Sequence, residues 1–226
     1  MAIPVLLIGK SGSGKSASLR TCVGNKHFNV INVLNKPFPF KGDINKGNTD
    51  DYNQVMKWLI QFPAESIVID DAGYLITNMF MKGHANAGAG NTVFAFYNKI
   101  GDHFWNLIEF IKEKVPANKI VYIVMHEDTD DFGNIRPKTI GKLLDEKVCI
   151  EGMFTIVLRC KTEGGKHYFL TQTTENDVAK TPIDMFTETQ IDNDLLAVDK
   201  AIRDYYDINV VEDNKEDKTN ETISGL

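Results

Sequence analysis

The fold class is decided by one short stretch of the sequence, Gly9-Lys10-Ser11-Gly12-Ser13-Gly14-Lys15-Ser16. It follows the apolar run of residues 3–8, which is typical of a buried parallel strand, and it leads into residues 15–22, which suit a helix. In this context the pattern is a P-loop, because glycines let backbone N–H groups converge on phosphates beside a helix N-terminus. The sequence therefore predicts a P-loop nucleotide-binding protein.

The P-loop pattern also assigns roles to single residues. Lys15 is expected to reach the β- and γ-phosphates of ATP, and the hydroxyl of Ser16 is expected to hold Mg²⁺. ATP and Mg²⁺ are therefore the predicted cofactors. The predicted nucleotide-binding residues are Gly9, Lys10, Ser11, Gly12, Ser13, Gly14, Lys15, Ser16 and Ala17.

A second motif, which is acidic, lies at the end of another buried strand. Residues 66–71 read Ser-Ile-Val-Ile-Asp-Asp, and ligands of open α/β sheets lie at the carboxyl ends of the strands. Asp70 is the predicted metal carboxylate, as in a Walker B motif. Asp71 either polarises the attacking water or is a loop acid that caps the next segment, and the sequence leaves both open.

The rest of the chain alternates strand and helix patterns. The prediction is an α/β fold of the P-loop NTPase class, a RecA-like core with a mostly parallel central sheet flanked by helices and a C-terminal antiparallel strand pair. Residues 1–206 form the predicted domain, and residues 207–226 an acidic, disordered tail. The expected strands are 28–34, 66–70, 120–125, 153–160 and 167–171. The expected helices are one that is capped at 49–51 and ends near 62, and then 92–114, 139–147 and 192–205. The expected loops are 35–48, 78–91 and 127–138.

Composition narrows the function classes. The chain has 226 residues, enough for one α/β core, and a net charge of −6, which does not indicate a strongly basic nucleic-acid binder but leaves room for a local basic patch. Its three cysteines form no C-x-x-C pair, which favours reduced thiols and a cytoplasmic protein, in the host cytoplasm if phage-encoded. No zinc-type spacing and no membrane-length apolar run is present.

Several P-loop classes fit poorly. A GTPase needs a late Asn-Lys-x-Asp motif, which this sequence does not have. A nucleotide kinase usually carries an arginine-rich lid, and a loader ATPase carries a helical lid after the core, and the sequence indicates neither. The motifs instead resemble, in order, those of compact RecA-like ATPases of phage recombination modules. The resemblance spans about residues 1–190 and rests on residues 9–16, 67–71 and 124–127, the strand pair around Arg159, and residues 179–182.

The resemblance implies further roles. His126 would be a polar sensor of the γ-phosphate, and Lys180 would reach the γ-phosphate of a neighbouring subunit in a homo-oligomer; an ordinary strand-end histidine and a surface lysine are the alternatives. Together with Lys15 and Asp71, they complete the predicted catalytic set. The loop 127–138 would face DNA through Phe132, Arg136 and Lys138, although Glu127, Asp128, Asp130 and Asp131 in the same loop repel DNA.

One departure concerns the catalytic acid. RecA-like enzymes often place a glutamate after the second core strand, whereas residues 32–36 here read Asn-Val-Leu-Asn-Lys. Hydrolysis is therefore expected to be slow or to depend on Asp71. The leading hypothesis is an ATPase of DNA recombination or replication that acts on single-stranded DNA with a single-strand binding or annealing protein. A nucleotide-dependent interaction switch of the loader or packaging type is the alternative, and a small-molecule kinase would need an acceptor pocket.

Overall fold

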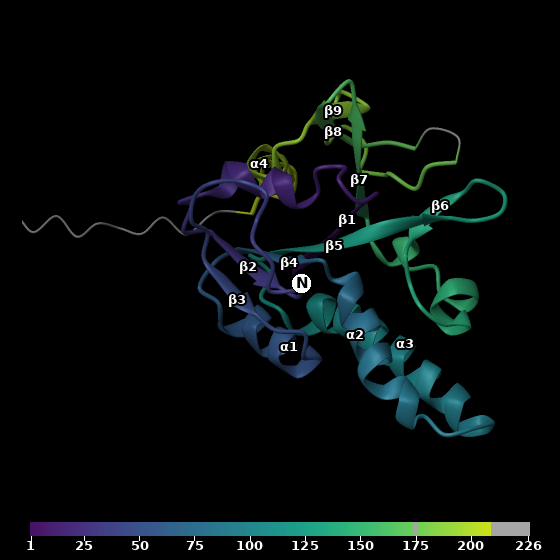
Figure 1. Cartoon of the computed structure of the whole chain (residues 1–226). Coiled ribbons are helices and arrows are strands. Elements are labelled where there is room, and N and C mark those ends of the chain that lie inside the picture. Colours follow the sequence, from purple (N-terminus) through teal and green to yellow (C-terminus); the bar gives the residue numbers. More distant parts are fainter. Residues whose placement is uncertain (174–175, 209–226) are drawn as a thin grey trace, which may run out of the picture.

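A computed structural model describes residues 1–173 and 176–208. One twisted sheet runs through the molecule and separates two layers of helices (Figure 1). The strands are β1 (Ile3–Gly9), β2 (Phe28–Asn32), β3 (Lys46–Asn48), β4 (Ser66–Asp70), β5 (Ile120–Thr129), β6 (Ile135–Pro137), β7 (Ile156–Glu163), β8 (Lys166–Leu170) and β9 (Gln190–Asp192). The helices are α1 (Tyr52–Gln61), α2 (Gly73–Gly83), α3 (Asn91–Lys114) and α4 (Leu195–Tyr205), with 3₁₀ turns at Ser16–Cys22, His84–Asn86 and Glu151–Met153 and a π-helical turn at Leu143–Lys147.

The strand order is β3-β2-β4-β5-β1-β7-β8-β9, and β6 pairs with β5 outside this path. The strands β3, β2, β4, β5, β1 and β7 run parallel, whereas β8 and β9 are antiparallel additions at one edge and β6 pairs antiparallel with the end of β5. This arrangement confirms the predicted α/β class with a mostly parallel sheet and antiparallel C-terminal strands. It places β5 between β1, which ends in the P-loop, and β4, which ends in Asp70.

The sheet is buried on both faces because its central strands are apolar throughout. Along β1, Leu6 and Ile8 pack toward α1, α2 and α3, while Val5 and Leu7 pack toward α4 and the 3₁₀ helix that follows the P-loop. Figure 1 shows the same division, with α4 on one side of the sheet and the other three helices on the opposite side. In a sheet covered on both faces, functional side chains can reach solvent only at the ends of the strands.

A buried polar cluster fastens α4 to the sheet. Asp199 of α4 accepts hydrogen bonds from Ser66 Oγ at 2.6 Å and from the Tyr122 hydroxyl at 2.9 Å. Arg203, one helical turn later, donates to Asp199 Oδ2 at 2.8 Å and to Ser66 Oγ at 2.7 Å. Each member is satisfied by another, which is the condition for burying such groups without a large cost.

Several predicted element bounds are wrong. The expected loop 78–91 contains the second half of α2, because Met79 and Phe80 pack against the core despite the nearby glycines. The expected loop 127–138 is a hairpin, since β5 continues to Thr129 and pairs with β6. The loop 35–48 ends in β3, the strand expected from residue 153 begins at Ile156, and the helix expected over 139–147 is only the π-helical turn.

The last helix begins later than predicted. Asp194 caps α4 by accepting a hydrogen bond from the backbone N–H of Ala197 at 3.0 Å, and residues 190–192 form β9 instead. Residues 209–226 of the predicted acidic tail lie outside the described residues, so the tail and the domain boundary at 206 stay predictions. Within the described residues, no helix is long and apolar enough to cross a membrane.

Candidate functional site

The P-loop connects the carboxyl end of β1 to the 3₁₀ helix at Ser16–Cys22. Gly12 and Gly14 have φ angles of 77° and 102°, in the left-handed region that favours glycine. A Cβ atom at Gly14 would also lie 2.6 Å from the ring of His167 on β8. Glycine at position 14 is therefore required by both the backbone conformation and its neighbour.

Side chains from the β7 side brace the P-loop backbone. The carbonyl of Ser13 accepts hydrogen bonds from Cys160 Sγ at 2.9 Å and Thr162 Oγ1 at 3.3 Å, and the carbonyl of Gly14 accepts one from Asn193 Nδ2 at 3.3 Å. Burial raises the pKa of Cys160 to about 11, so its thiol stays protonated and can donate. These contacts, together with the hydrogen bond from Ser13 N–H to the Lys10 carbonyl at 3.2 Å, fix the shape of the loop backbone.

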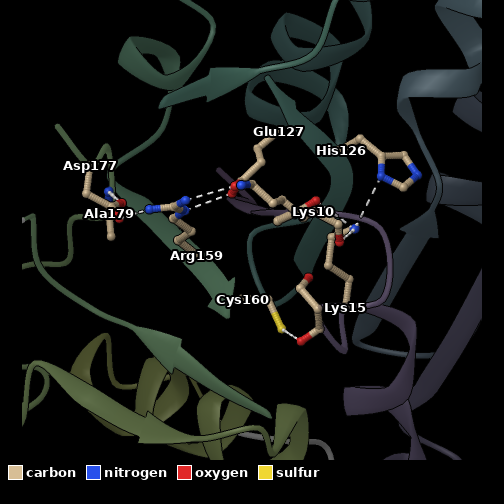
Figure 2. Close-up of polar contacts among 10 residues, drawn as sticks. Lys10, Lys15, His126, Glu127, Arg159, Cys160, Asp177 and Ala179 are labelled. Carbon is tan, nitrogen blue, oxygen red and sulfur yellow. Dashed lines mark hydrogen bonds and ion pairs between the residues drawn. The ribbon is translucent and has the colours of Figure 1, made fainter. Parts of the chain in front are cut away.

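Lys15 lies in the position expected of the phosphate-binding lysine. Its ammonium group donates to the carbonyls of Gly9 and Lys10, both at 2.8 Å, and lies 3.5 Å from His126 Nδ1 (Figure 2). Burial lowers the pKa of Lys15, and the nearby Cys160, Asp71, Asp70 and Glu127 oppose that effect. The carbonyl contacts are ones that a lysine can exchange for phosphate oxygens.

Ser16 and Asp70 meet beside Lys15. Ser16 Oγ donates to Asp70 Oδ1 at 2.9 Å, and Asp70 is 1% exposed. Burial, and then the charge of Asp71, raise the pKa of Asp70 to about 6. A buried carboxylate with a hydroxyl at its side offers the hard oxygen ligands that Mg²⁺ prefers. The predicted metal residues therefore fit the ion.

No group of three or more His, Cys, Asp or Glu side chains able to hold a metal occurs in the part of the chain that the structure describes. This is compatible with Mg²⁺, which usually takes one or two protein ligands and completes its shell with water and substrate phosphates.

Asp71 is held in an unusual conformation. Its φ of 58° is in the left-handed region, and it is 3% exposed. Its carboxylate forms an ion pair with Lys36 and lies 3.7 Å from His126 Nε2. Burial is the main cause that lowers the pKa of His126, so the ring is neutral and can accept from Lys15 on Nδ1 while Nε2–H faces Asp71.

The structure thus gathers most of the predicted site. The residues Lys15, Ser16, Asp70, Asp71 and His126 converge at the carboxyl ends of β1, β4 and β5. Two cavities open there, of about 290 and 610 Å³, and Ser11, Lys36 and His126 line both. Lys36 had no predicted role, because only the lack of an acid after the second strand was noted in the sequence.

A second charged group lies on the other side of Lys10. Arg159 of β7 is paired with Glu127 at the end of β5 and with Asp177, and the side chains of both acids are 2% exposed (Figure 2). Glu127 was expected among the acids of a DNA-facing loop. That expectation is wrong, because the residue is turned inward and neutralised by Arg159.

The three predicted DNA-binding residues differ in exposure and surroundings. Phe132 is 87% exposed at the tip of the β5–β6 hairpin, whereas Arg136 is half-buried within β6. Lys138 lines the larger cavity, and its backbone N–H donates to the carbonyl of His126 at 2.8 Å. The hairpin therefore connects the nucleotide side of β5 to an exposed aromatic ring.

Lys180 lies apart from the P-loop of its own chain. Its backbone exchanges two hydrogen bonds with Val157, at 2.8 and 2.9 Å, near the amino end of β7. The P-loop lies at the carboxyl ends of these parallel strands. A role for Lys180 in the phosphate site of a neighbouring subunit stays a prediction.

The strand order, the P-loop and the paired Ser16 and Asp70 define a P-loop nucleotide-binding domain. A family model described as "AAA domain" matches residues 1–183, and the chain belongs to this family of AAA-type P-loop domains. No curated protein matches the chain. The family assignment supports ATP as the nucleotide and is broader than the resemblance to recombination ATPases.

Proposed function

We propose that the protein binds ATP with Mg²⁺ and hydrolyses it to ADP and phosphate. The contact between Ser16 and Asp70, beside the ammonium group of Lys15, carries this proposal, because it joins a hydroxyl, a carboxylate and a cation at the end of a P-loop. Ser16 and Asp70 would hold Mg²⁺, which when bound neutralises charge on the β- and γ-phosphates.

The other site residues have roles that follow from their positions. Lys15 would exchange its carbonyl partners for the β- and γ-phosphate oxygens and balance the charge that moves onto ADP. Asp71 would orient the water whose oxygen bonds to the γ-phosphorus as the bond to ADP breaks. His126, between Lys15 and Asp71, would detect whether the γ-phosphate is present.

We further propose that the protein acts in DNA recombination or replication, on single-stranded DNA together with a single-strand binding or annealing protein. The β5–β6 hairpin supports this proposal. Its paired strands begin at Glu127, directly after His126, and its tip presents the exposed ring of Phe132, on which a base can stack. The Asp130 carboxylate stabilises the turn of the hairpin, since it accepts hydrogen bonds from Phe132 N and from both nitrogens of Asn134. These hydrogen bonds offset part of its repulsion of DNA.

An interaction switch is the second candidate. Asp128, Asp130 and Asp131 precede Phe132 in the hairpin, and an exposed aromatic ring close in sequence to acids suits a basic protein partner as well as DNA bases. In that case ATP would change the position of the hairpin through His126, and the protein would bind its partner in one nucleotide state.

The deciding experiment is ATP hydrolysis with and without single-stranded DNA, with Lys15→Ala as the blank. We expect hydrolysis that DNA accelerates, and DNA binding that weakens as salt rises. Phe132→Ala should remove the acceleration, whereas Phe94→Ala, which changes an exposed ring on α3, should keep it. Hydrolysis that is indifferent to DNA would favour the interaction switch, and hydrolysis equal to that of Lys15→Ala would refute the ATPase.

A further inference from the structure

The loop after β2 places a second lysine at the phosphate site. Asn32, the last residue of β2, is 1% exposed, and its side chain fixes the backbone of Lys36: Nδ2 donates to the Lys36 carbonyl at 2.7 Å, and Oδ1 accepts from the Lys36 N–H at 3.4 Å. Asn35 completes the turn with a φ of 51°. A buried carboxamide and a strained residue therefore hold Lys36 in place.

Its side chain points into the site from this fixed backbone. The ammonium group is paired with Asp71 and lines the same two cavities as Ser11 and His126. Burial alone would lower the pKa of Lys36, but the contact with Asp71 outweighs it and the pKa is raised, so the side chain is charged. Nearly half of the side chain (46%) is exposed, which leaves it room to change partner.

We propose that Lys36 is a second phosphate-binding cation, which moves from Asp71 to the γ-phosphate when ATP binds. This inference rests on the proposed ATPase function and adds a residue to it. In the structure Lys36 neutralises Asp71. When it moves to the γ-phosphate, the Asp71 carboxylate becomes free to orient water, so the two events are coupled through one side chain.

Charge and reach favour the exchange. A terminal phosphate carries more negative charge than a carboxylate, and lysine is a point charge on a flexible stem of four carbons. β2 and β4 are neighbours in register, Asn32 opposite Asp70, so the end of β2 lies at the Walker B carboxylates. RecA-like enzymes often place an acid after the second strand, whereas this chain places the cation Lys36 there. The acid that orients water would instead be Asp71.

The test compares Lys36→Ala with Lys41→Ala, which removes an exposed lysine from the same loop. A fluorescent ADP, a non-hydrolysable ATP analogue and single-turnover hydrolysis of Mg²⁺–ATP are the three measurements. For Lys36→Ala we expect ADP affinity within about twofold of the wild type, a loss of about tenfold in the preference for the ATP analogue, and hydrolysis slower by roughly 100-fold or more. Lys41→Ala should match the wild type.

Lys36→Arg provides the conservative control, because it keeps the charge, and we expect it to recover part of the preference for the ATP analogue. Unchanged hydrolysis and unchanged preference in Lys36→Ala would overturn the proposal, and so would faster hydrolysis, which would make Lys36 an inhibitor of Asp71 instead. Normal ADP binding shows that the variant is folded. Failure of the wild type to exceed Lys15→Ala would refute the ATPase itself, which is a different result.

Discussion

Arg159 of β7 and Glu127 of β5 form a two-point ion pair: Nε donates to Oε2 at 2.7 Å and Nη2 donates to Oε1 at 2.8 Å. β1 lies between these two strands, so the pair bridges the end of the strand that carries the P-loop. Arg159 also binds Asp177, which joins the segment before Lys180 to the same group. The pair therefore fixes the positions of three segments around the P-loop.

Removal of Arg159 should strongly destabilise the fold. Arg159→Ala leaves Glu127 and Asp177 buried without their cation, a situation that typically costs about 3–5 kcal/mol in the free energy of unfolding. Urea denaturation measures the loss. The double variant Arg159→Met with Glu127→Gln should lose less than the sum of its single changes, since no charge is then left unpaired at that contact. Additive losses would contradict the coupling.

Asp70→Asn should stabilise the nucleotide-free protein while it abolishes Mg²⁺-dependent hydrolysis. The folded-state pKa of Asp70 is raised to about 6, so its charged form destabilises the fold above that pH, by up to about 3 kcal/mol. The cost disappears as the pH falls from about 6 to below 4, where the carboxyl group is protonated in both states. Thermal unfolding at pH 7.5 and pH 4 checks both the size and the sign. A variant that is less stable at pH 7.5 would contradict this assignment.

The buried cluster on α4 should matter far more than its exposed cap. Asp199→Ala removes the acceptor shared by Ser66, Tyr122 and Arg203 and leaves a buried guanidinium unpaired, so we expect a loss of about 3–5 kcal/mol. Asp194→Ala removes only the helix cap and should cost about 1 kcal/mol. Equal losses in the two variants, measured by urea denaturation, would show that the cluster does not anchor the helix.

Lys180 can be tested by mixing subunits. If it reaches a neighbour's γ-phosphate, hydrolysis per subunit should rise with protein concentration, and Lys180→Ala should be impaired. Mixing it with Lys15→Ala should then restore hydrolysis, because the second variant supplies Lys180 to a P-loop that keeps Lys15. Lys200→Ala, on an exposed position of α4, is the control. Hydrolysis that does not depend on concentration would rule out the role in a neighbouring subunit.

The sequence was sufficient for the parts of the fold that depend on local patterns. Continuous apolar runs identified the central strands, and the glycine spacing with its flanking elements identified the P-loop. Asp70 could be placed as well, because an acid at the end of a buried parallel strand has few other positions to occupy. The second half of α2 was wrongly predicted as a loop, because glycines favour a loop and the sequence does not show that Met79 and Phe80 pack against the core.

The missed site residues depend on contacts between distant segments. Nothing near Lys36 in the sequence indicates Asp71, and nothing near Glu127 indicates Arg159, because strand order alone brings these partners together. In the sequence, Arg159 served only to locate a strand pair that resembles one in related ATPases, and no partner for its side chain was predicted. Lys180 shows the opposite limit, since its predicted role concerns another subunit and a single chain cannot test it.

The ends of the sheet have a consequence for self-association. Its outermost strands, β3 and β9, have three residues each, and the long strands are enclosed between them. So short an edge gives an incoming chain few backbone groups to pair with, which protects a sheet protein against aggregation. Any association between copies of this protein would therefore have to use side chains and loops, because the sheet of the described residues offers no long edge for a continuous β-ladder between subunits.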